Sequence, residues 1–250
     1  MLLLLGVPEL PRQGLTYPPE NSILLTRESS VTVRWNLPGR KFRVELFRAG
    51  NVVKSEVVEA NRWQIEASPG GQYAWRVTPL QAVGARPQSS HFSVAQQFEF
   101  RAPGRTGSPG KNGSNGGQVR VRLARDGAGM NLWIWERDRH LHYLCLDPQS
   151  RFLISVKGGD GGKGEDGIEF DTLKKACGQP GGSAGWGGTV EISTRDAPWR
   201  DYLAVDVSPG EPGEGGQGGR YYWYGNIQKA PDGERGQPGR PGRVVTVIEP

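Results

Sequence analysis

The sequence has few of the residues and motifs on which enzymes and metal sites depend. Among its 250 residues there are two cysteines and three histidines, and no CxxC pair of the kind that holds zinc is present. GxSxG, HExxH and P-loop motifs are also missing, and no βαβ pattern surrounds the glycine-rich segments, as a dinucleotide site would require. The sequence therefore predicts a protein that is not an enzyme, with no catalytic residues and no cofactor.

Long apolar runs and clustered charge are missing as well. Met1–Leu5 is apolar, but it has no basic leader and is short for a signal sequence, so whether it is a remnant of one stays open. No stretch approaches the roughly 20 apolar residues of a membrane span. The formal net charge of +5 comes from scattered side chains, which predicts no nucleic-acid binding. Cys145 and Cys177 allow either one disulfide or two thiols.

Glycine, in contrast, is abundant and unevenly distributed. Only seven of the 38 glycines lie before residue 104, and this shift in composition predicts a domain boundary near Pro103. We expect an N-terminal extension over residues 1–14, a first domain over 15–102 and a glycine-rich second domain over 103–250.

The first domain shows the alternation that is typical of antiparallel strands. Val31, Val33 and Trp35 point to one face of a strand, while Thr32 and Arg34 point to the other. The same alternation recurs in four further segments: Phe42–Leu46, Trp63–Ile65, Tyr73–Val77 and Phe98–Phe100. Turns rich in glycine and proline separate these segments, and short strands at this spacing indicate a β-sandwich.

One of these segments resembles a known family. Pro69–Val77, with the sequence PGGQYAWRV, is similar to the PGxxYxWRV strand of bacterial fibronectin type III-like modules. Trp35 stands where such modules carry an early-strand tryptophan, and Phe98–Phe100 matches their closing strand. The resemblance implies an Ig- or fibronectin-like sandwich, with Tyr73 as a tyrosine-corner residue bonded to nearby backbone. An unrelated sandwich with the same alternation is the alternative.

The second domain contains five runs in which glycine recurs at every third residue. They begin at Gly104, Gly158, Gly182, Gly210 and Gly233. Three residues per turn is the period of the extended polyproline II helix, in which every third residue lies on one face. Glycine on that face lets another backbone approach closely. Because the runs are short and strand-like segments separate them, we expect a polyglycine II bundle within one chain, not a collagen trimer.

The second, third and fourth runs carry a second row of glycines. A helix with two bare faces can be approached from two sides, so these three runs are predicted to be interior and the first and fifth peripheral. Gly162→Val is accordingly expected to disturb the fold more than Gly107→Val. The glycines predicted to make the closest backbone contacts are Gly158, Gly161, Gly164, Gly182, Gly185, Gly188, Gly213, Gly216 and Gly219.

Strand-like alternation returns between the runs, for example in Val119–Leu123, Phe152–Val156 and Leu203–Val207. The predicted fold class is therefore all-β, with an Ig- or fibronectin type III-like β-sandwich followed by a β domain that contains the glycine-rich helices. This design resembles the glycine-rich, collagen-like proteins of bacterial envelopes and the adhesins of phage fibre tips. The resemblance implies an exported protein with a structural or adhesive role, and it brings no site residues with it.

Candidate metal ligands are weak. Asp160, Glu165 and Asp166 lie in the second run, and acidic glycine-rich loops can bind calcium through oxygen atoms. Solvated charges on the outer face of the run are the favoured interpretation, so no metal is predicted. His140 and His142 fall on one side of a strand and are expected to be surface residues.

Aromatic side chains provide the candidate binding surface. Neighbouring aromatic residues on one strand cannot all face a single core, so some should be exposed, where they suit sugar stacking or protein interfaces. The alternative is that these rings shield glycine backbone from water. The candidate residues are Trp133, Trp135, Trp186, Trp199, Tyr222 and Trp223.

Two functions follow from these observations. The first is a structural component of the periplasm, outer membrane or extracellular space, which docks onto other protein subunits of an envelope assembly or filament. The second is an adhesin, or a receptor- or carbohydrate-binding module, that uses the exposed tryptophan and tyrosine side chains.

Overall fold

The computed structural model describes residues 16–81, 84–95, 97–126, 129–145, 151–195 and 199–249. The predicted N-terminal extension, including Met1–Leu5, lies outside these residues. The protein is mostly β, with 46% strand and 3% helix, and its sheets mix parallel and antiparallel pairs. The expected all-β class is confirmed at this level. The chain divides into two compact units: unit 1 contains Met1–Gln97 and His142–Asp147, and unit 2 contains Phe98–Leu141 and Pro148–Pro250.

Unit 1 contains two groups of adjacent strands. The first is an antiparallel sheet in the order β1 (Thr16–Tyr17), β3 (Ser30–Trp35) and β6 (Arg62–Glu66). The second follows the order β2 (Ser22–Leu25), β8 (Gln88–Ala95), β7 (Gln72–Pro79), β4 (Phe42–Arg48) and β5 (Asn51–Val58). β2 pairs parallel with β8, and the other pairs of this group are antiparallel.

The alternating side chains of these strands form one buried cluster. The cluster includes Val33 and Trp35 from β3, Phe42 from β4 and Trp75 from β7, all of which are nearly inaccessible to solvent. The ring of Trp35 lies edge-on to Phe42, with centroids 5.5 Å apart. Side chains from both groups of strands therefore share a single core, which removes the alternating apolar positions from water.

The Tyr73 hydroxyl is bonded to backbone close by in the sequence. It accepts a hydrogen bond from the Ser68 N–H at 2.8 Å and donates one to the Ser68 carbonyl oxygen at 3.4 Å. A Cβ atom on Gly71 would come within 3.0 Å of the Tyr73 ring. The second glycine of the PGG sequence thus leaves room for this tyrosine.

Two segments differ from the expected division of the chain. β9 (Glu99–Arg101), which matched the closing strand of the first domain, pairs instead with β13 (Phe152–Ser155) of unit 2. Leu144, at the end of β12 (Arg139–Cys145), is buried in the core of unit 1, where Tyr143–Cys145 pairs parallel with β2. These parallel pairings join segments far apart in the sequence, and local alternation does not reveal them.

Unit 2 is built around two sets of parallel strands. In one, β18 (Arg243–Ile248), β14 (Thr189–Thr194) and β10 (Gln118–Asp126) lie in that order, and β11 (Gly129–Glu136) pairs antiparallel with β10. In the other, the order is β15 (Leu203–Asp206), β13 (Phe152–Ser155) and β9, with a short 3-10 helix η1 (Trp199–Asp201) before β15.

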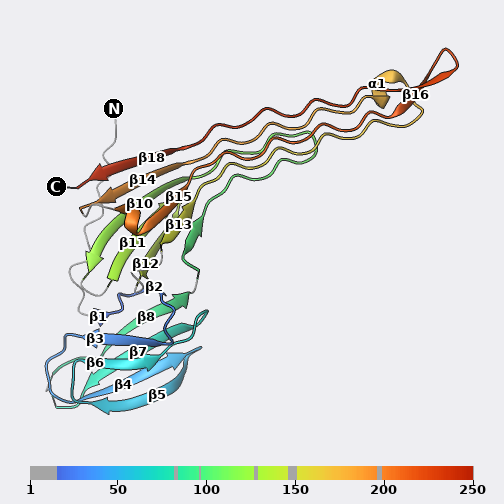
Figure 1. The fold of residues 1–250 in the computed structure, drawn as a ribbon. Helices are drawn as coiled ribbons and strands as arrows, with labels where there is room; N and C mark the ends of the chain where they lie inside the picture. Colours follow the sequence, from blue (N-terminus) through green and yellow to red (C-terminus); the bar gives the residue numbers. More distant parts are fainter. Residues whose placement is uncertain are drawn as a thin grey trace. The chain divides into compact units, whose positions relative to one another are not determined.

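Six extended segments continue from or lead into these strands, and we name them legs 1 to 6. Legs 3 to 6 reach the opposite end of unit 2, whereas legs 1 and 2 turn back before it (Figure 1). The six segments are leg 1 (102–108), leg 2 (111–117), leg 3 (156–168), leg 4 (178–188), leg 5 (207–219) and leg 6 (230–242). Legs 1, 3 and 5 continue from β9, β13 and β15, and legs 2, 4 and 6 lead into β10, β14 and β18. Parallel strands in register thus set the spacing of the legs.

The first glycine run differs from the expected single helix because it turns back on itself. The Lys111 N–H donates to the Ser108 carbonyl oxygen at 2.8 Å, across a turn that contains Gly110. Gly110 has a φ of 68°, which glycine adopts without a steric penalty. The run therefore forms two antiparallel legs.

Backbone hydrogen bonds join the legs laterally. Leg 3 is bonded to legs 1, 2, 4 and 5, and leg 4 is bonded to legs 2, 3, 5 and 6. Gly161 of leg 3, for example, donates its N–H to the carbonyl oxygen of Glu211 in leg 5 at 2.8 Å. Eight of the nine glycines predicted to be structural donate in this way to another leg, and Gly219 donates to the carbonyl oxygen of Ala176, the last residue of α1 (Leu173–Ala176). These glycine donors are thus satisfied although the legs do not form strands.

Close approach explains why these donors are glycines. A Cβ atom on any of the nine would come within 3.0 Å of another leg's backbone. The same holds for both Gly107 and Gly162, so the large difference expected between Gly107→Val and Gly162→Val does not follow from the available space. Leg 1 and leg 3 are both too close to their neighbours for a side chain at these positions.

Candidate binding surface at the far end of the legs

Two connections lie at the end of the legs opposite the long strands of unit 2 (Figure 1). Legs 3 and 4 are joined through the single helical turn α1 (Leu173–Ala176), and legs 5 and 6 through the hairpin of β16 (Arg220–Trp223) and β17 (Asn226–Lys229). A small buried cluster of Ala176, Tyr221 and Ala230 holds the two connections together. The Tyr221 hydroxyl also donates to the Gln228 side-chain oxygen at 3.1 Å.

The hairpin turn places an aromatic residue in an unfavourable backbone conformation. Trp223 and Asn226 are paired, which leaves Tyr224 and Gly225 as a two-residue loop with φ values of 45° and 79°. Positive φ at both positions belongs to the type I′ turn, which prefers Asn or Gly at its first position. Tyr224 occupies that position with a side chain that is 90% exposed. Packing within the described residues therefore does not account for a tyrosine here.

A second aromatic residue nearby shares this unusual backbone. Phe170 has a φ of 58°, and 48% of its side chain is exposed. Its N–H donates to the Arg220 carbonyl oxygen at 2.6 Å, and its ring lies 5.6 Å from that of Tyr222. The Trp223 and Tyr224 rings meet edge to face at 5.0 Å. Phe170 is thus tied to the hairpin through both its backbone and its ring.

The exposed apolar side chains at this end form what we call the tip cluster. Besides Phe170 and Tyr224, it contains aliphatic side chains that are 42–57% exposed. Several exposed apolar side chains gathered at one end of a domain commonly mark an interaction site. The members are Ile168, Phe170, Leu173, Tyr222, Trp223, Tyr224 and Ile227.

Charged pairs border the tip cluster. The Arg220 guanidinium lies 2.9 Å from a Glu169 carboxylate oxygen and stands over the Phe170 ring at 5.0 Å from its centroid. Asp171 accepts a hydrogen bond from the Thr172 N–H and pairs with Lys175 at 3.2 Å, and both contacts lower the pKa of the Asp171 carboxyl. An apolar centre with a charged border is the usual composition of a protein interface.

The structure separates the six aromatic residues that the sequence nominated. Tyr222 and Trp223 belong to the tip cluster. Trp133 is only 8% exposed, so the expectation that it contributes to an exposed surface is wrong; its strand β11 is covered. Trp135 is half-buried and stacks on His140, with ring centroids 5.0 Å apart. The Trp199 side chain lies outside the described residues.

Trp186 is exposed but stands away from the tip cluster. It lies in leg 4, is 51% exposed, and has the Arg240 guanidinium 5.5 Å from its ring centroid. Its N–H donates to the Asn115 side-chain oxygen at 2.9 Å. Trp186 of leg 4 therefore contacts Arg240 of leg 6 and does not belong to the tip cluster.

Sequence reasoning missed Phe170 and Tyr224, which carry the strongest structural signal. Both follow the end of a glycine run, at the points where the threefold period stops. The sequence therefore predicts that both residues lie in connections between glycine runs, but it does not predict their left-handed backbone conformation. Ile168, Leu173 and Ile227 were also missed, because single aliphatic residues give no sequence signal for exposure.

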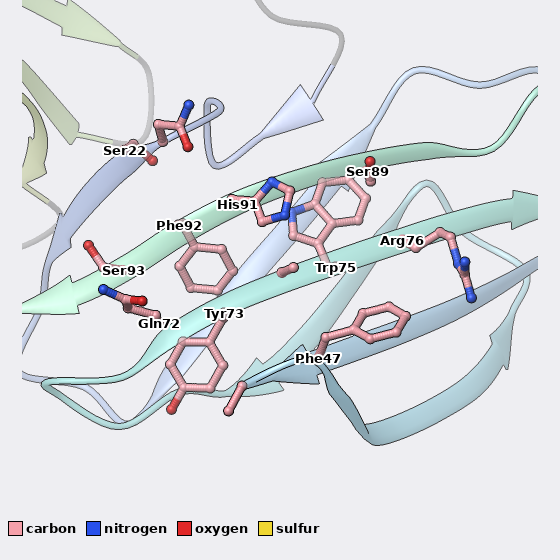
Figure 2. A pocket seen from close by; sticks show the side chains of 14 residues that line it. Ser22, Phe47, Gln72, Tyr73, Trp75, Arg76, Ser89, His91, Phe92 and Ser93 are labelled. Carbon is pink, nitrogen blue, oxygen red and sulfur yellow. The ribbon is translucent and has the colours of Figure 1, made fainter.

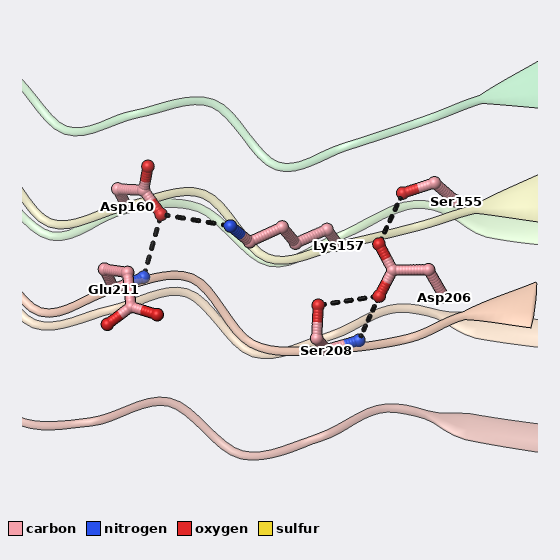
Figure 3. A network of polar contacts seen from close by, with 6 residues as sticks. All are labelled: Ser155, Lys157, Asp160, Asp206, Ser208 and Glu211. Carbon is pink, nitrogen blue, oxygen red and sulfur yellow. Dashed lines mark hydrogen bonds and ion pairs between the residues drawn. The ribbon is translucent and has the colours of Figure 1, made fainter.

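The acidic residues considered for calcium have other partners. Asp160 accepts the Glu211 N–H at 2.8 Å and pairs with Lys157 at 3.8 Å, and the nearby Asp206 accepts hydrogen bonds from Ser155 and Ser208 (Figure 3). Asp166 makes the equivalent contacts with the Gln217 N–H and Lys163. Glu165 is an exposed residue of leg 3. The Asp160 and Asp166 carboxylates thus cap backbone donors of leg 5, the N–H groups of Glu211 and Gln217.

The remaining histidine, cysteine and acidic side chains of the described residues lie apart from one another or in pairs. No group of three or more His, Cys, Asp or Glu side chains gathers among residues 16–249 outside the undescribed gaps. His91 is paired with Glu20 at 2.8 Å. Cys145 is buried and Cys177 half-buried, each as a thiol. In the part of the chain that the structure describes, no helix is long and apolar enough to cross a membrane.

Unit 1 contains a hollow of about 710 Å³. Phe47, Arg76 and His91 are among its lining residues, and Figure 2 shows these side chains on neighbouring strands. Arg76 is already held by the Glu45 carboxylate at 2.9 Å and stands over Phe47. Asn21 and Ala49 in its lining also have positive φ values, of 57° and 50°, but neither is aromatic, and the hollow lacks the exposed aromatic grouping of the tip cluster.

Comparison with known proteins adds no further assignment. No protein-family model matches this chain. No curated protein and no solved structure shows significant similarity to it. The function must therefore be argued from the residues and their geometry.

Proposed function

We propose that this chain is a non-enzymatic, extracellular binding protein that recognises a protein surface through its tip cluster. The observation that carries the proposal is the positive φ of Phe170 and Tyr224. Left-handed backbone at a bulky residue costs roughly 1–3 kcal/mol and collects at functional sites. Both aromatic residues in this conformation are exposed, and both lie in the same cluster.

The composition of the tip cluster favours a protein partner over a carbohydrate. Aromatic rings alone would suit sugar stacking, but here Ile168, Leu173 and Ile227 extend the apolar surface. Branched aliphatic side chains offer a sugar little, whereas they complement the apolar centre of a protein interface. Exposed tryptophan and tyrosine at the centre would then supply most of the binding energy. A carbohydrate-binding adhesin is the alternative outcome.

In this proposal the legs are a bundle of polyproline II-type helices, a polyglycine II bundle, that holds the tip cluster away from the strands. Three observations support the bundle: the threefold glycine period, the lateral hydrogen bonds and the absence of room for side chains between legs. A support bonded at every third residue resists bending, so the connections at its end are presented in fixed positions. Such presentation reduces the entropy lost on binding.

Unit 1 would serve as the attachment module. Its shared core, the Tyr73 hydrogen bond and the PGGQYAWRV sequence together support a fibronectin type III-like β-sandwich. Modules of that kind are common in proteins that act outside the cell, and this consideration supports an exported location. Docking of unit 1 onto a larger assembly remains part of the proposal and does not depend on the tip cluster.

A binding assay with matched tryptophan variants tests the proposed function. The labelled chain is applied to a panel of intact bacterial cells and to a glycan array, and the Trp223→Ser and Trp186→Ser variants are compared with it. The two side chains are 49% and 51% exposed, so loss of exposed ring area is equal in both. We expect Trp223→Ser to weaken cell binding at least about ten-fold and Trp186→Ser to leave it unchanged. Equal effects of the two variants, or binding to glycans alone, would contradict the proposal.

A further inference from the structure

β18 is an exposed edge strand with almost no charge. Among the described residues its one neighbouring strand is β14. All six of its residues are exposed, and the apolar ones, Val244, Val245, Val247 and Ile248, are 40–62% exposed. An edge of this kind offers unpaired backbone groups together with apolar side chains, which makes it a site for strand pairing.

The edge strand of unit 1 shows how this chain protects an edge elsewhere. β5 is also exposed along most of its length, and Val52, Val53 and Val57 are 47–54% exposed. However, Lys54 and Glu56 stand in the middle of β5, 4.0 Å apart. Charged side chains in an edge strand discourage pairing with another chain. β18 has no charged residue after Arg243 at its start, so it lacks this protection.

One face of β18 continues a face that is buried in the neighbouring strand. Val244, Thr246 and Ile248 lie beside Val190, Ile192 and Thr194 of β14. The three β14 residues are fully buried, whereas the three β18 residues are exposed. The packing that buries this face of β14 therefore does not extend to β18. Apolar side chains of an added strand would bury part of the exposed face of β18.

The backbone of β18 determines which residues can pair outward. Arg243 and Glu249 donate their N–H groups to the carbonyl oxygens of Gly188 and Thr194, on the β14 side. Because backbone groups alternate along a strand, Val244, Thr246 and Ile248 direct their N–H and C=O groups to the open edge. The centre of the available edge is thus Thr246.

We propose that β18 pairs antiparallel with β18 of a second copy of this chain, with Thr246 facing Thr246 on the two-fold axis. In this register Val244 lies opposite Ile248 and Val245 opposite Val247, so apolar residues meet on both faces. Every outward-directed backbone group then finds a partner. The strand is self-complementary, as a two-fold symmetric interface requires.

Charge also favours the antiparallel arrangement of the two copies. Arg243 begins β18 and Glu249 follows it, so an antiparallel pair brings opposite charges together at each end, whereas a parallel pair would bring like charges together. Glu249 is already held by Arg122 at 2.9 Å, so this contribution is small. A six-residue strand pair is smaller than a standard interface, and we expect a weak dimer that forms at roughly tens of micromolar.

Cysteine cross-linking tests the register. Thr246→Cys places two thiols in a directly opposite pair, with Cα atoms about 5.5 Å apart, a distance that a disulfide spans. Val245→Cys is the matched control, because its own copy lies diagonally at about 7–8 Å and should not bridge. Under mild oxidation of the full chain we expect at least about ten-fold more disulfide dimer from Thr246→Cys. The wild-type chain measures the background from Cys145 and Cys177.

A mixture of Val245→Cys and Val247→Cys chains provides the second test, since the proposed register predicts a mixed dimer between them. Equal cross-linking of Thr246→Cys and Val245→Cys, or a disulfide formed only within one chain, would overturn the proposal. The proposal would also be overturned if the wild-type chain stays monomeric at hundreds of micromolar in sedimentation. The same holds if the Ile248→Lys variant dimerises as strongly as the wild-type chain. These readouts do not involve the tip cluster, so they can fail or succeed independently of the proposed function.

Discussion

Phe170 and Tyr222 face each other with ring centroids 5.6 Å apart, although one follows leg 3 and the other follows leg 5. The Phe170 N–H also donates to the carbonyl oxygen of Arg220 at 2.6 Å. These contacts join two connections of the chain at the end of the legs. An exposed aromatic surface is thereby held by backbone hydrogen bonds and a small core, not by a free loop.

Replacing Tyr224 with asparagine should stabilise the protein and weaken binding at the same time. Asparagine is favoured at the first position of a type I′ turn, where Tyr224 has a φ of 45°. We expect the free energy of unfolding to rise by about 0.5–1 kcal/mol, and cell binding to fall at least about ten-fold. Thermal denaturation and the cell-binding assay measure the two effects.

The interpretation requires that Tyr224→Asn raises stability while it weakens binding. Tyr222→Phe is the control, because it keeps the ring and removes only a hydroxyl from a side chain that is 61% exposed. We expect it to change stability by less than about 0.5 kcal/mol. If Tyr224→Asn destabilises the chain, or leaves binding intact, Tyr224 is not retained for recognition.

Adding one methyl group between the legs should be severely destabilising. Gly161→Ala would bring a Cβ atom within 3.0 Å of the Gly182 carbonyl oxygen, and the legs would have to separate and lose hydrogen bonds. We expect a loss of about 3 kcal/mol or more. Ala184 stands in an equivalent row and is 6% exposed, so Ala184→Gly should cost about 1 kcal/mol at most. Similar melting temperatures for both variants would contradict close packing of the legs.

The carboxylates that cap neighbouring legs should make stability depend on pH. Hydrogen bonding from the Gln217 N–H and the pairing with Lys163 lower the pKa of Asp166. A lowered pKa in the folded state means that Asp166 stabilises the fold above its ordinary value of 3.8 and loses this effect as the pH falls below it. The pKa of Asp232 is lowered in the same way by the Gly218 N–H and Lys229.

Two variants of Asp166 separate its charge from its hydrogen bond. Asp166→Asn keeps an oxygen that can accept from Gln217, whereas Asp166→Ala removes it. At neutral pH we expect the melting temperature to fall in the order wild type, Asn variant, Ala variant. The gap between wild type and Asp166→Asn should narrow as the pH falls below 3.8 and the carboxylate becomes protonated. A gap that is independent of pH would show that the carboxylate charge contributes nothing.

Removing the Tyr73 hydroxyl should destabilise unit 1 without affecting the legs. The Ser68 N–H donates to this hydroxyl at 2.8 Å, and in Tyr73→Phe the N–H would lose its partner. We expect a cost of about 1.5 kcal/mol. Hydrogen exchange should show faster exchange in unit 1 and unchanged protection of glycine N–H groups in the legs. Faster exchange in the legs as well would mean that the two units do not unfold separately.

The sequence predicts the elements of this fold better than their partners. Alternation located strands such as β3, β4 and β7, because side-chain period follows directly from strand geometry. The threefold glycine rows identified the donors between legs, because glycine is required where two backbones meet. The parallel pairing of β9 with β13, and of Tyr143–Cys145 with β2, escaped detection because it joins residues far apart in the chain.

The sequence predicted only part of the candidate site. Tyr222 and Trp223 were nominated because consecutive aromatic residues cannot all be buried. Trp133 was nominated on the same pattern and is covered, since a strand pattern gives no information about what packs on its outer face. Phe170 and Tyr224 depend on backbone conformation at the connections, which only the folded structure provides.

Photo-cross-linking from the tip cluster tests the central claim most directly. A photoreactive phenylalanine analogue is placed at Tyr224 in one chain, at Trp186 in a second and at Phe47 in a third, and each is illuminated while bound to the cells it recognises. The account predicts a cross-link to one cell-surface protein from Tyr224 and little or none from the other two positions. A cross-link from Trp186 or Phe47 that is as strong as the one from Tyr224, or no cross-link from Tyr224, would contradict it.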